Sequence, residues 1–390
     1  MAQGSPSPVV DVRMRTGERS WGRRSTHEPA RTVVVHPGAL GDFVQALPAF
    51  AALRVAYRAS ELVLATGPDL AELARASGLF NAVIAYDTRA LWRGRAVARI
   101  RALASLVRVL RRGRFEQAIL FKASSAYAAV AFAAGIPVRV GFTRCGSVGS
   151  RLLTTAVPYA AGVHREDRLA SLVRSAGADP EQMAPVQWPI DPGELDSALH
   201  TTRAGPRIVM APGGARNAKE EMACRRWPIA RYTELAERVA ADEPDAHFVL
   251  LGGPGDLAET GALRTALGEA RVTDLTARTS VAAARAVIDR TDVFVGNDSG
   301  LLHLAGTTST PIVAVFGPTD PGEACPRRPG VQALWNPARA SACMDDVTGE
   351  LPPCVRPCCI TRVDVAAVHA AVRGALAHPA RDRLDVTSSA

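Results

Sequence analysis

Short apolar runs typical of buried strands alternate with segments of helical spacing along most of this chain. Residues 32–36 (TVVVH) form a β-branched run typical of a buried parallel strand, and a turn containing Gly38 and Gly41 follows. Residues 43–57 then place their apolar side chains on one helical face. Because a strand, a glycine turn and a helix form the opening unit of an α/β domain, the sequence predicts a parallel sheet.

The alternation continues along most of the chain and restarts once. In the first series, strands are expected at 61–65, 82–86, 117–121 and 138–142, and helices at 69–77, 95–112 and 126–134. In the second series, strands are expected at 207–211, 247–251, 272–275, 293–296 and 312–316, and helices at 229–240, 257–267, 281–289 and from 301. This pattern predicts two doubly wound α/β domains with a ligand-binding cleft between them.

Changes in composition mark the expected domain boundaries. The N-terminal residues are rich in Ser, Pro, Gly and Arg and lack the apolar core of a signal peptide, so a disordered extension is expected there. The alternation lapses again at Trp-Pro-Ile-Asp-Pro-Gly, which is typical of a linker. We therefore expect an extension at 1–30, an N-terminal Rossmann-like domain at 31–188, a linker at 189–206, a C-terminal Rossmann-like domain at 207–362, a helix at 363–378 and a tail at 379–390.

The distribution of charge limits the kinds of partner. The 390 residues include 46 Lys and Arg against 38 Asp and Glu, a net charge of +8. Residues 31–200 hold 20 basic and 13 acidic residues, so most of the excess lies in the first half. Aromatic and basic residues do not interleave as they do in nucleic-acid-binding modules, and no apolar run reaches the roughly 18 residues that span a bilayer. The sequence predicts a cytoplasmic protein whose first half would meet an anionic partner.

Three motifs of nucleotide chemistry are absent from the sequence. The glycines after the first strand, Gly38 and Gly41, do not have the Gly-x-Gly-x-x-Gly spacing. The chain also lacks the phosphate loop Gly-x4-Gly-Lys-Ser/Thr and any Asp-x-Asp pair. Since neighbouring carboxylates are the usual ligands of a divalent metal on a diphosphate, no metal is predicted to assist such chemistry.

Polar residues do follow the strands, at the end where α/β sheets bind their ligands. Asp42 stands after the first strand at the start of a helix, where it is either a helix cap or a functional acid. In the second half, Gly213 and Gly214 follow a strand, and Arg225 and Arg226 precede a helix. Basic side chains near a glycine-rich turn suit a diphosphate, although a solvated basic loop has the same composition.

Four segments, in this order, resemble the heptosyltransferases of glycosyltransferase family 9. They are Gly-Ala-Leu-Gly-Asp (38–42), Pro-Gly-Gly-Ala (212–215) with Arg-Arg-Trp-Pro (225–228), Gly-Asn-Asp-Ser-Gly-Leu-Leu-His-Leu-Ala (296–305) and Phe-Gly-Pro-Thr-Asp-Pro (316–321). The resemblance covers about residues 31–375. It implies a GT-B architecture, in which two Rossmann-like domains face a central cleft. It also implies an inverting, metal-independent transfer of heptose from ADP-heptose to an acidic sugar of the lipopolysaccharide inner core.

The same resemblance implies roles for single residues. Asp42 matches the catalytic base, which takes the proton of the acceptor hydroxyl, and a somewhat raised pKa in a partly closed cleft would suit that task. The family has a lysine where this chain has Arg225. One or more of Arg225, Arg226 and Lys219 is therefore expected to stabilise the leaving diphosphate.

The remaining donor contacts implied by the resemblance also lie in the second domain. Asp256 matches the acid that binds the ribose hydroxyls, and the loop around Thr279 matches the adenine-binding segment. The backbone amides of Ser299 and Gly300 are expected to meet the sugar and diphosphate together with Asp298. The full set of expected donor-binding residues is Gly213, Gly214, Lys219, Arg225, Arg226, Asp256, Thr279, Asp298, Ser299, Gly300 and His303.

The acceptor is expected on the first domain, where Gly41, Lys122 and Ser124 follow strands. Between Arg89 and Arg114 the chain has nine arginines and no acidic residue. This segment is either a solvated helix face or a surface that docks an anionic acceptor or the inner face of the membrane. Its apolar residues have helical spacing and are expected on one face: Val97, Ile100, Leu103, Val107 and Leu110.

Four of the seven cysteines fall within 17 residues. They are Cys343, Cys354, Cys358 and Cys359. Thiolates bind zinc or iron in many proteins, but the Cys-x10-Cys-x3-Cys-Cys spacing lacks a Cys-x2-Cys pair. Structural thiols are therefore the preferred interpretation.

The sequence thus predicts a glycosyltransferase with no cofactor, whose partners are a nucleotide-sugar donor and an anionic glycolipid or sugar acceptor. Two alternatives keep the same fold. One is a GT-B enzyme that uses another nucleotide sugar on a secondary metabolite, a glycan or a protein. The other is a non-catalytic sugar- or nucleotide-binding module. The presence of Asp42 together with the diphosphate loops favours an enzyme.

Overall fold

The computed structural model describes residues 29–144, 147–186, 205–214, 221–337, 343–344 and 359–378. Most of the expected N-terminal extension (1–30) and linker (189–206) and all of the expected tail (379–390) lie outside these residues. Lys219, Cys354 and Cys358 also lie outside them.

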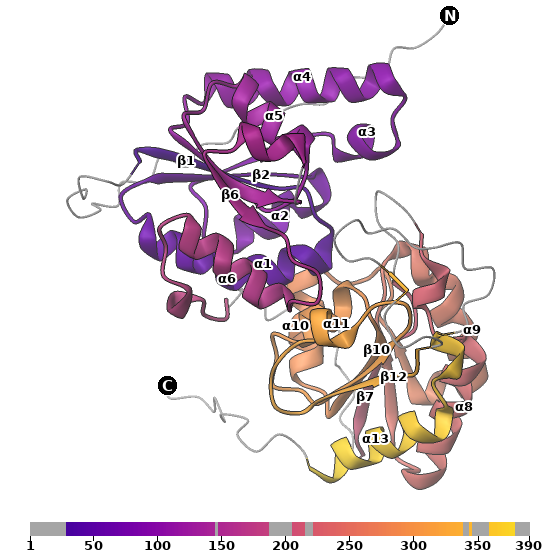
Figure 1. Cartoon of the computed structure of the whole chain (residues 1–390). Helices are drawn as coiled ribbons and strands as arrows, with labels where there is room; N and C mark the ends of the chain where they lie inside the picture. The colour runs from indigo at the N-terminus through magenta and orange to yellow at the C-terminus, as the bar shows by residue number, and fades with distance from the viewer. Residues whose placement is uncertain are drawn as a thin grey trace, which may run out of the picture. The chain divides into compact units, whose positions relative to one another are not determined.

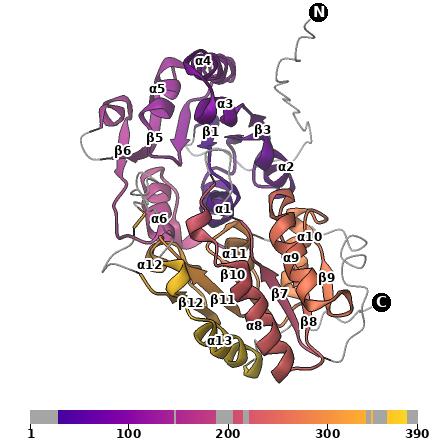
Figure 2. The same ribbon diagram turned by 90° about the vertical axis from the view of Figure 1, so that its right-hand side faces the viewer.

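The chain forms two compact units, with the main boundary between Trp188 and Pro189. Each unit contains one six-stranded parallel sheet with helices on both of its faces (Figures 1 and 2). This arrangement confirms the predicted α/β class. Among the residues that the structure describes, no helix has the length and apolarity needed to cross a membrane.

Unit 1 is the N-terminal unit, and its strands have the order β3-β2-β1-β4-β5-β6. The strands are β1 (Arg31–His36), β2 (Glu61–Thr66), β3 (Ala82–Ala85), β4 (Gln117–Leu120), β5 (Val138–Thr143) and β6 (Thr155–Pro158). The helices are α1 (Leu40–Ala56), α2 (Pro68–Ala76), α3 (Thr88–Arg93), α4 (Ala96–Arg112), α5 (Ser125–Ala133) and α6 (Arg165–Ser175).

Unit 2 repeats the same topology, with the strand order β12-β11-β10-β7-β8-β9. The strands are β7 (Arg207–Ala211), β8 (His247–Leu250), β9 (Val272–Asp274), β10 (Val293–Asn297), β11 (Ile312–Phe316) and β12 (Val331–Trp335). The helices are α8 (Ile229–Asp242), α9 (Leu257–Leu267), α10 (Val281–Asp289), α11 (Gly300–Ala305), α12 (Pro321–Ala324) and α13 (Val365–Ala377).

One edge strand of each sheet, β6 in unit 1 and β12 in unit 2, is absent from the sequence-based prediction. In β6 only Val157 is buried, and no residue of β12 is fully buried. An edge strand has one neighbour and less cover, so it lacks the continuous apolar run by which a central strand is recognised.

Strand order reverses at one place in each sheet, between β1 and β4 in unit 1 and between β7 and β10 in unit 2. Chain connections leave this point in opposite directions, so a crevice forms outside the carboxyl ends of the two central strands. The loop after β1 leads to Asp42, and the loop after β7 contains Gly213 and Gly214. Topology therefore brings the expected site segments of each unit to its switch point.

Helix α4 buries only part of its apolar face. Leu106 and Leu110 are buried in the core, and Leu103 and Val107 pack against it, but Val97 and Ile100 are 59% and 65% exposed. The helix contacts α3 and α5, and Leu106 and Leu110 in its C-terminal half belong to the core of the unit. The expected apolar face is thus buried in its last turns and presents apolar side chains to solvent in its first turns.

Candidate active site

In unit 1, the turn after β1 places Asp42 in the first turn of α1. The backbone N–H of Ala39 donates to Asp42 Oδ2 over 3.3 Å. Gly38 is required by space, since a Cβ there would lie 2.7 Å from both Asp42 Cβ and His36 Cε1. The side chain of Asp42 remains 44% exposed, so it is both fixed by the turn and accessible to a ligand.

Positive charge surrounds this carboxylate. Arg165 Nη1 lies 3.5 Å from Asp42 Oδ1, and Lys122 and His36 also act on it. Burial disfavours the charged form, but the nearby positive charges and the Ala39 N–H outweigh burial and lower the pKa of Asp42. The raised pKa expected for this residue is therefore wrong, and Asp42 is ionised at neutral pH.

His36, the last residue of β1, borders the same turn. Its ring meets those of Phe43 and Phe50 edge-on at 5.6 Å and that of Phe121 at 6.0 Å. Burial in this aromatic cluster lowers its pKa to about 4. His36 is therefore neutral at pH 7, and it supports the turn rather than supplying charge.

The expected acceptor residues follow β1 and β4, which are neighbours in the sheet. Gly41 is the second residue of α1, and the exposed Lys122 lies two residues after the end of β4. Ser124 occupies the N-cap position of α5, and its hydroxyl makes no capping hydrogen bond. Arg165 could not be expected from the sequence, because it lies 123 residues beyond Asp42 and no local motif marks it.

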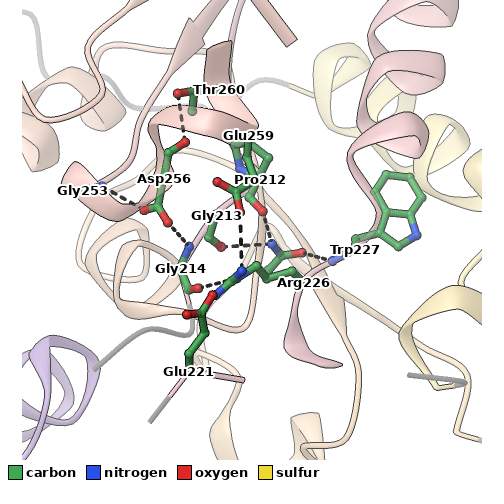
Figure 3. Close-up of polar contacts among 11 residues, drawn as sticks. Pro212, Gly213, Gly214, Glu221, Arg226, Trp227, Gly253, Asp256, Glu259 and Thr260 are labelled. Atoms are coloured by element: carbon green, nitrogen blue, oxygen red, sulfur yellow. Dashed lines mark hydrogen bonds and ion pairs between the residues drawn. The ribbon is translucent and has the colours of Figure 1, made fainter. Parts of the chain in front are cut away.

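In unit 2, Asp256 joins two loops (Figure 3). Its Oδ1 accepts the N–H of Gly214 and its Oδ2 accepts the N–H of Gly253, both over 2.9 Å. A Cβ at Gly213 would overlap the Asp256 carboxyl group, and Gly214 has a φ of 86°. The buried Asp256 thus holds the loops after β7 and β8 together, whichever ligand they bind.

A fully buried amide, Asn297, connects the end of β10 to the same loop. Asn297 Nδ2 donates to the carbonyls of Pro212 and Gly213 over 2.7 and 3.1 Å. Its Oδ1 accepts the Trp227 N–H and the Tyr232 hydroxyl, each over 3.0 Å. Asn297 lies inside the segment that resembles the family, yet it was not among the expected site residues. The hydrogen-bond partners of Asn297 lie 65 to 85 residues away in the sequence, so no local pattern reveals its role.

Asp298, next to Asn297, is wholly buried and forms an ion pair with Arg225. His303 Nε2 lies 3.7 Å from its other carboxylate oxygen. A buried carboxylate of this kind orients the cation beside it. Ser299 and Gly300 stand at the start of α11, where a Cβ on Gly214 would come within 2.6 Å of Ser299 Cβ.

Arg226 is held in a different way from Arg225. Its Nε donates to the Gly214 carbonyl over 2.9 Å, and its terminal nitrogens pair with Glu221 at 2.7 Å and Glu259 at 3.4 Å. Two carboxylates therefore share the charge expected to face a diphosphate. Thr279 is half-buried and precedes Ser280, whose hydroxyl caps α10.

No group of three or more His, Cys, Asp or Glu side chains within the described ranges is arranged to hold a metal ion. Cys343 and Cys359 place their Sγ atoms 3.6 Å apart.

Residues 103–352 match the model of glycosyltransferase family 9 (heptosyltransferase), so the chain belongs to this family, as the resemblance predicted. Lipopolysaccharide heptosyltransferase 2 of Escherichia coli K12 is 29% identical over 227 residues, which cover 54% of this chain. That alignment spans 62% of the length of the E. coli protein, or somewhat less than two thirds.

Solved structures share the fold. The E. coli ADP-heptose lipopolysaccharide heptosyltransferase II has a TM-score of 0.67 at 20% identity, with 89% of this chain and 99% of that chain covered. A family 9 glycosyltransferase from Veillonella parvula has a TM-score of 0.71 at 18% identity, with 90% and 98% covered. The fold class is therefore GT-B, as expected.

We expect Asn297→Ala to destabilise unit 2 by about 3 kcal/mol, because it leaves the buried Trp227 N–H and the carbonyls of Pro212 and Gly213 without this partner. Urea unfolding followed by circular dichroism measures the change. Asn336→Ala is the matched control, since its exposed amide makes one hydrogen bond, to the Arg362 carbonyl. Equal destabilisation by the two substitutions would contradict the role given to Asn297.

Proposed function

We propose that this protein is an inverting glycosyltransferase that moves heptose from ADP-heptose to an anionic sugar of the lipopolysaccharide inner core without a metal ion. The observation that carries the proposal is an ionised, accessible Asp42 at the switch point of unit 1 in a member of glycosyltransferase family 9. The names of the similar proteins, which refer to heptose, ADP-heptose and lipopolysaccharide, support the choice of substrates.

The proposed reaction is a single displacement. The acceptor oxygen attacks the anomeric carbon, the bond from that carbon to the ADP oxygen breaks, and the hydroxyl proton moves to Asp42. A carboxylate with a lowered pKa is ionised at neutral pH and can accept a proton, but it is a weak base. It therefore removes the proton late, when the new bond to carbon has already made the hydroxyl acidic.

The donor half of the proposal assigns ADP-heptose to the switch point of unit 2. Gly213 and Gly214 let the backbone approach a diphosphate closely. Arg225 is a better candidate than Arg226 for stabilising the leaving diphosphate, because the charge of Arg226 is shared with Glu221 and Glu259. Asp298 holds Arg225 in place, so no reorganisation is needed as charge builds on the leaving ADP.

The proposed location is cytoplasmic and peripheral, at the inner face of the membrane. The first turns of α4 expose Val97 and Ile100 among exposed arginines that include Arg95, Arg99 and Arg101. Apolar side chains flanked by arginines suit the boundary between the acyl chains and anionic headgroups. This face would bring unit 1 to a lipid-linked acceptor.

ADP should raise the free energy of unfolding by about 2.7 kcal/mol at 100 times its Kd, because only the native state binds it. UDP, GDP and dTDP at the same concentration should stabilise the protein less. Thermal unfolding measures the effect. Gly213→Ala should abolish it through overlap with Asp256, whereas Gly261→Ala, whose Cβ would enter open space, should keep it. Stabilisation by another nucleotide in place of ADP would favour a different nucleotide-sugar donor.

Asp42→Asn should lower the transfer rate by about 10²–10⁴-fold, because the amide accepts no proton from the acceptor hydroxyl. The assay is the release of ADP from ADP-heptose with heptose-deficient lipopolysaccharide as acceptor. ADP should still stabilise the variant, which separates loss of catalysis from loss of folding. Asp69→Asn, an exposed acid on α2, is the control. A wild-type rate for Asp42→Asn would refute the mechanism.

Binding to vesicles should depend on α4. We expect the double variant Val97→Asp, Ile100→Asp to lose most of its co-flotation with vesicles that contain anionic phospholipid, because it removes buried apolar contact and adds repulsion. High salt should weaken wild-type binding. Val55→Asp, an exposed site on α1, is the control. Unchanged flotation of the double variant would remove α4 from the proposed membrane contact.

A further inference from the structure

Arg165 is the first residue of α6, and its side chain contacts α1 at two points. Its Nη1 lies 3.5 Å from Asp42 Oδ1 and donates to Gln45 Oε1 over 3.2 Å. Asp42 and Gln45 are one helical turn apart, so a single guanidinium spans both. Only 15% of the Arg165 side chain is exposed, compared with 44% for Asp42.

The surrounding structure holds Arg165 in this place. His164 caps α6, with its Nδ1 accepting the Glu166 N–H over 3.2 Å. One turn further on, the Arg168 guanidinium lies 4.5 Å from the centroid of the Tyr159 ring and donates to the Tyr159 hydroxyl over 2.9 Å.

The far end of α6 is fixed to α1 as well. The Tyr57 hydroxyl, just after α1, donates to the carbonyl of Ala176, just after α6, and Leu172 and Val173 are buried between them and the rest of the unit. The two helices pack along their lengths. The guanidinium therefore approaches Asp42 from a rigid frame rather than from a loop.

We propose that Arg165 is a positioning residue, which holds the Asp42 carboxylate in one orientation and keeps it charged for proton transfer. The proposal rests on the role of Asp42 as the base. Asp42 Oδ2 is engaged by the Ala39 N–H and Oδ1 by Arg165, so the plane of the carboxylate is set from two directions. Each oxygen has a second lone pair, which remains for the acceptor proton.

Three charged or titratable groups act on Asp42: His36 on β1, Lys122 after β4 and Arg165 on α6. His36 has a pKa of about 4 and is neutral near pH 7, and Lys122 is exposed and screened by solvent. Of these three groups, Arg165 lowers the pKa of Asp42 the most. Burial raises the pKa of Asp42 and Arg165 lowers it, so removal of Arg165 should raise that pKa.

The sign of the pH effect follows from the need for an ionised base. Activity is lost as the pH falls through the pKa of Asp42, which Arg165 holds below the ordinary value of about 3.9. In Arg165→Gln the acid limb of kcat/KM should therefore move to higher pH, by about 1 pH unit or more. We expect kcat/KM at pH 7 to fall about 10-fold or more through loss of orientation.

The test measures kcat/KM from pH 2.5 to pH 8, a range that extends below the ordinary pKa of an aspartate, with ADP-heptose and heptose-deficient lipopolysaccharide for the wild type, Arg165→Gln and Arg165→Lys. The lysine variant keeps the charge and should restore the acid limb toward its wild-type position, a rescue that a merely structural role would not produce. Arg174→Gln, at an exposed position near the end of α6, is the matched control and should leave the profile unchanged.

Asp42→Asn, assayed in parallel, separates the two proposals. If Asp42→Asn retains the wild-type rate, the proposed base is wrong. If Asp42→Asn is inactive while Arg165→Gln keeps the wild-type rate and acid limb, the role of Arg165 is overturned and that of Asp42 stands. An equal shift of the acid limb in Arg165→Gln and Arg165→Lys would also overturn it, because the positive charge at position 165 would then not be what keeps Asp42 ionised.

Discussion

Both units depend on one constraint, the burial of an entirely parallel sheet between two layers of helices. Parallel strands need crossover connections, and a sheet covered on both faces must send these connections in opposite directions from its centre. The strand order therefore reverses once, between β1 and β4 or between β7 and β10. Loops that follow the central strands meet at this point, which is why segments distant in sequence form one site in each unit.

Backbone turns at these points need fixed partners, because a buried polar group without one is costly. In unit 2, Asn297 and Asp256 supply them, with each of their polar side-chain atoms bonded to the glycine loops or to the start of α8. Asp298 likewise holds the Arg225 guanidinium through an ion pair. The loops that would face a diphosphate are thus shaped before any ligand arrives, which lowers the cost of binding.

The charges of the two sites are arranged in opposite ways. In unit 1 the Asp42 carboxylate lies near basic side chains, whereas in unit 2 Arg225 and Arg226 pair with carboxylates. As a result, the Asp42 carboxylate is charged at any pH near neutrality and is only weakly basic. Lys122 and Arg165 add a local positive field, in keeping with the excess of basic residues in the first half of the chain.

The α/β class, the central strands and the segments at the switch points can be predicted from the sequence alone, because burial on both faces requires continuous apolar runs and tight turns require glycine. Asp42 can be placed in the same way, because its position is local to its turn. The folded chain was needed to reveal the lowered pKa of Asp42, the pairing of Arg226 with Glu221 and Glu259, and the contacts of Asn297 and Arg165. These properties arise from side chains that lie far apart in the sequence, and electrostatic and hydrogen-bonding energies depend on distance in space.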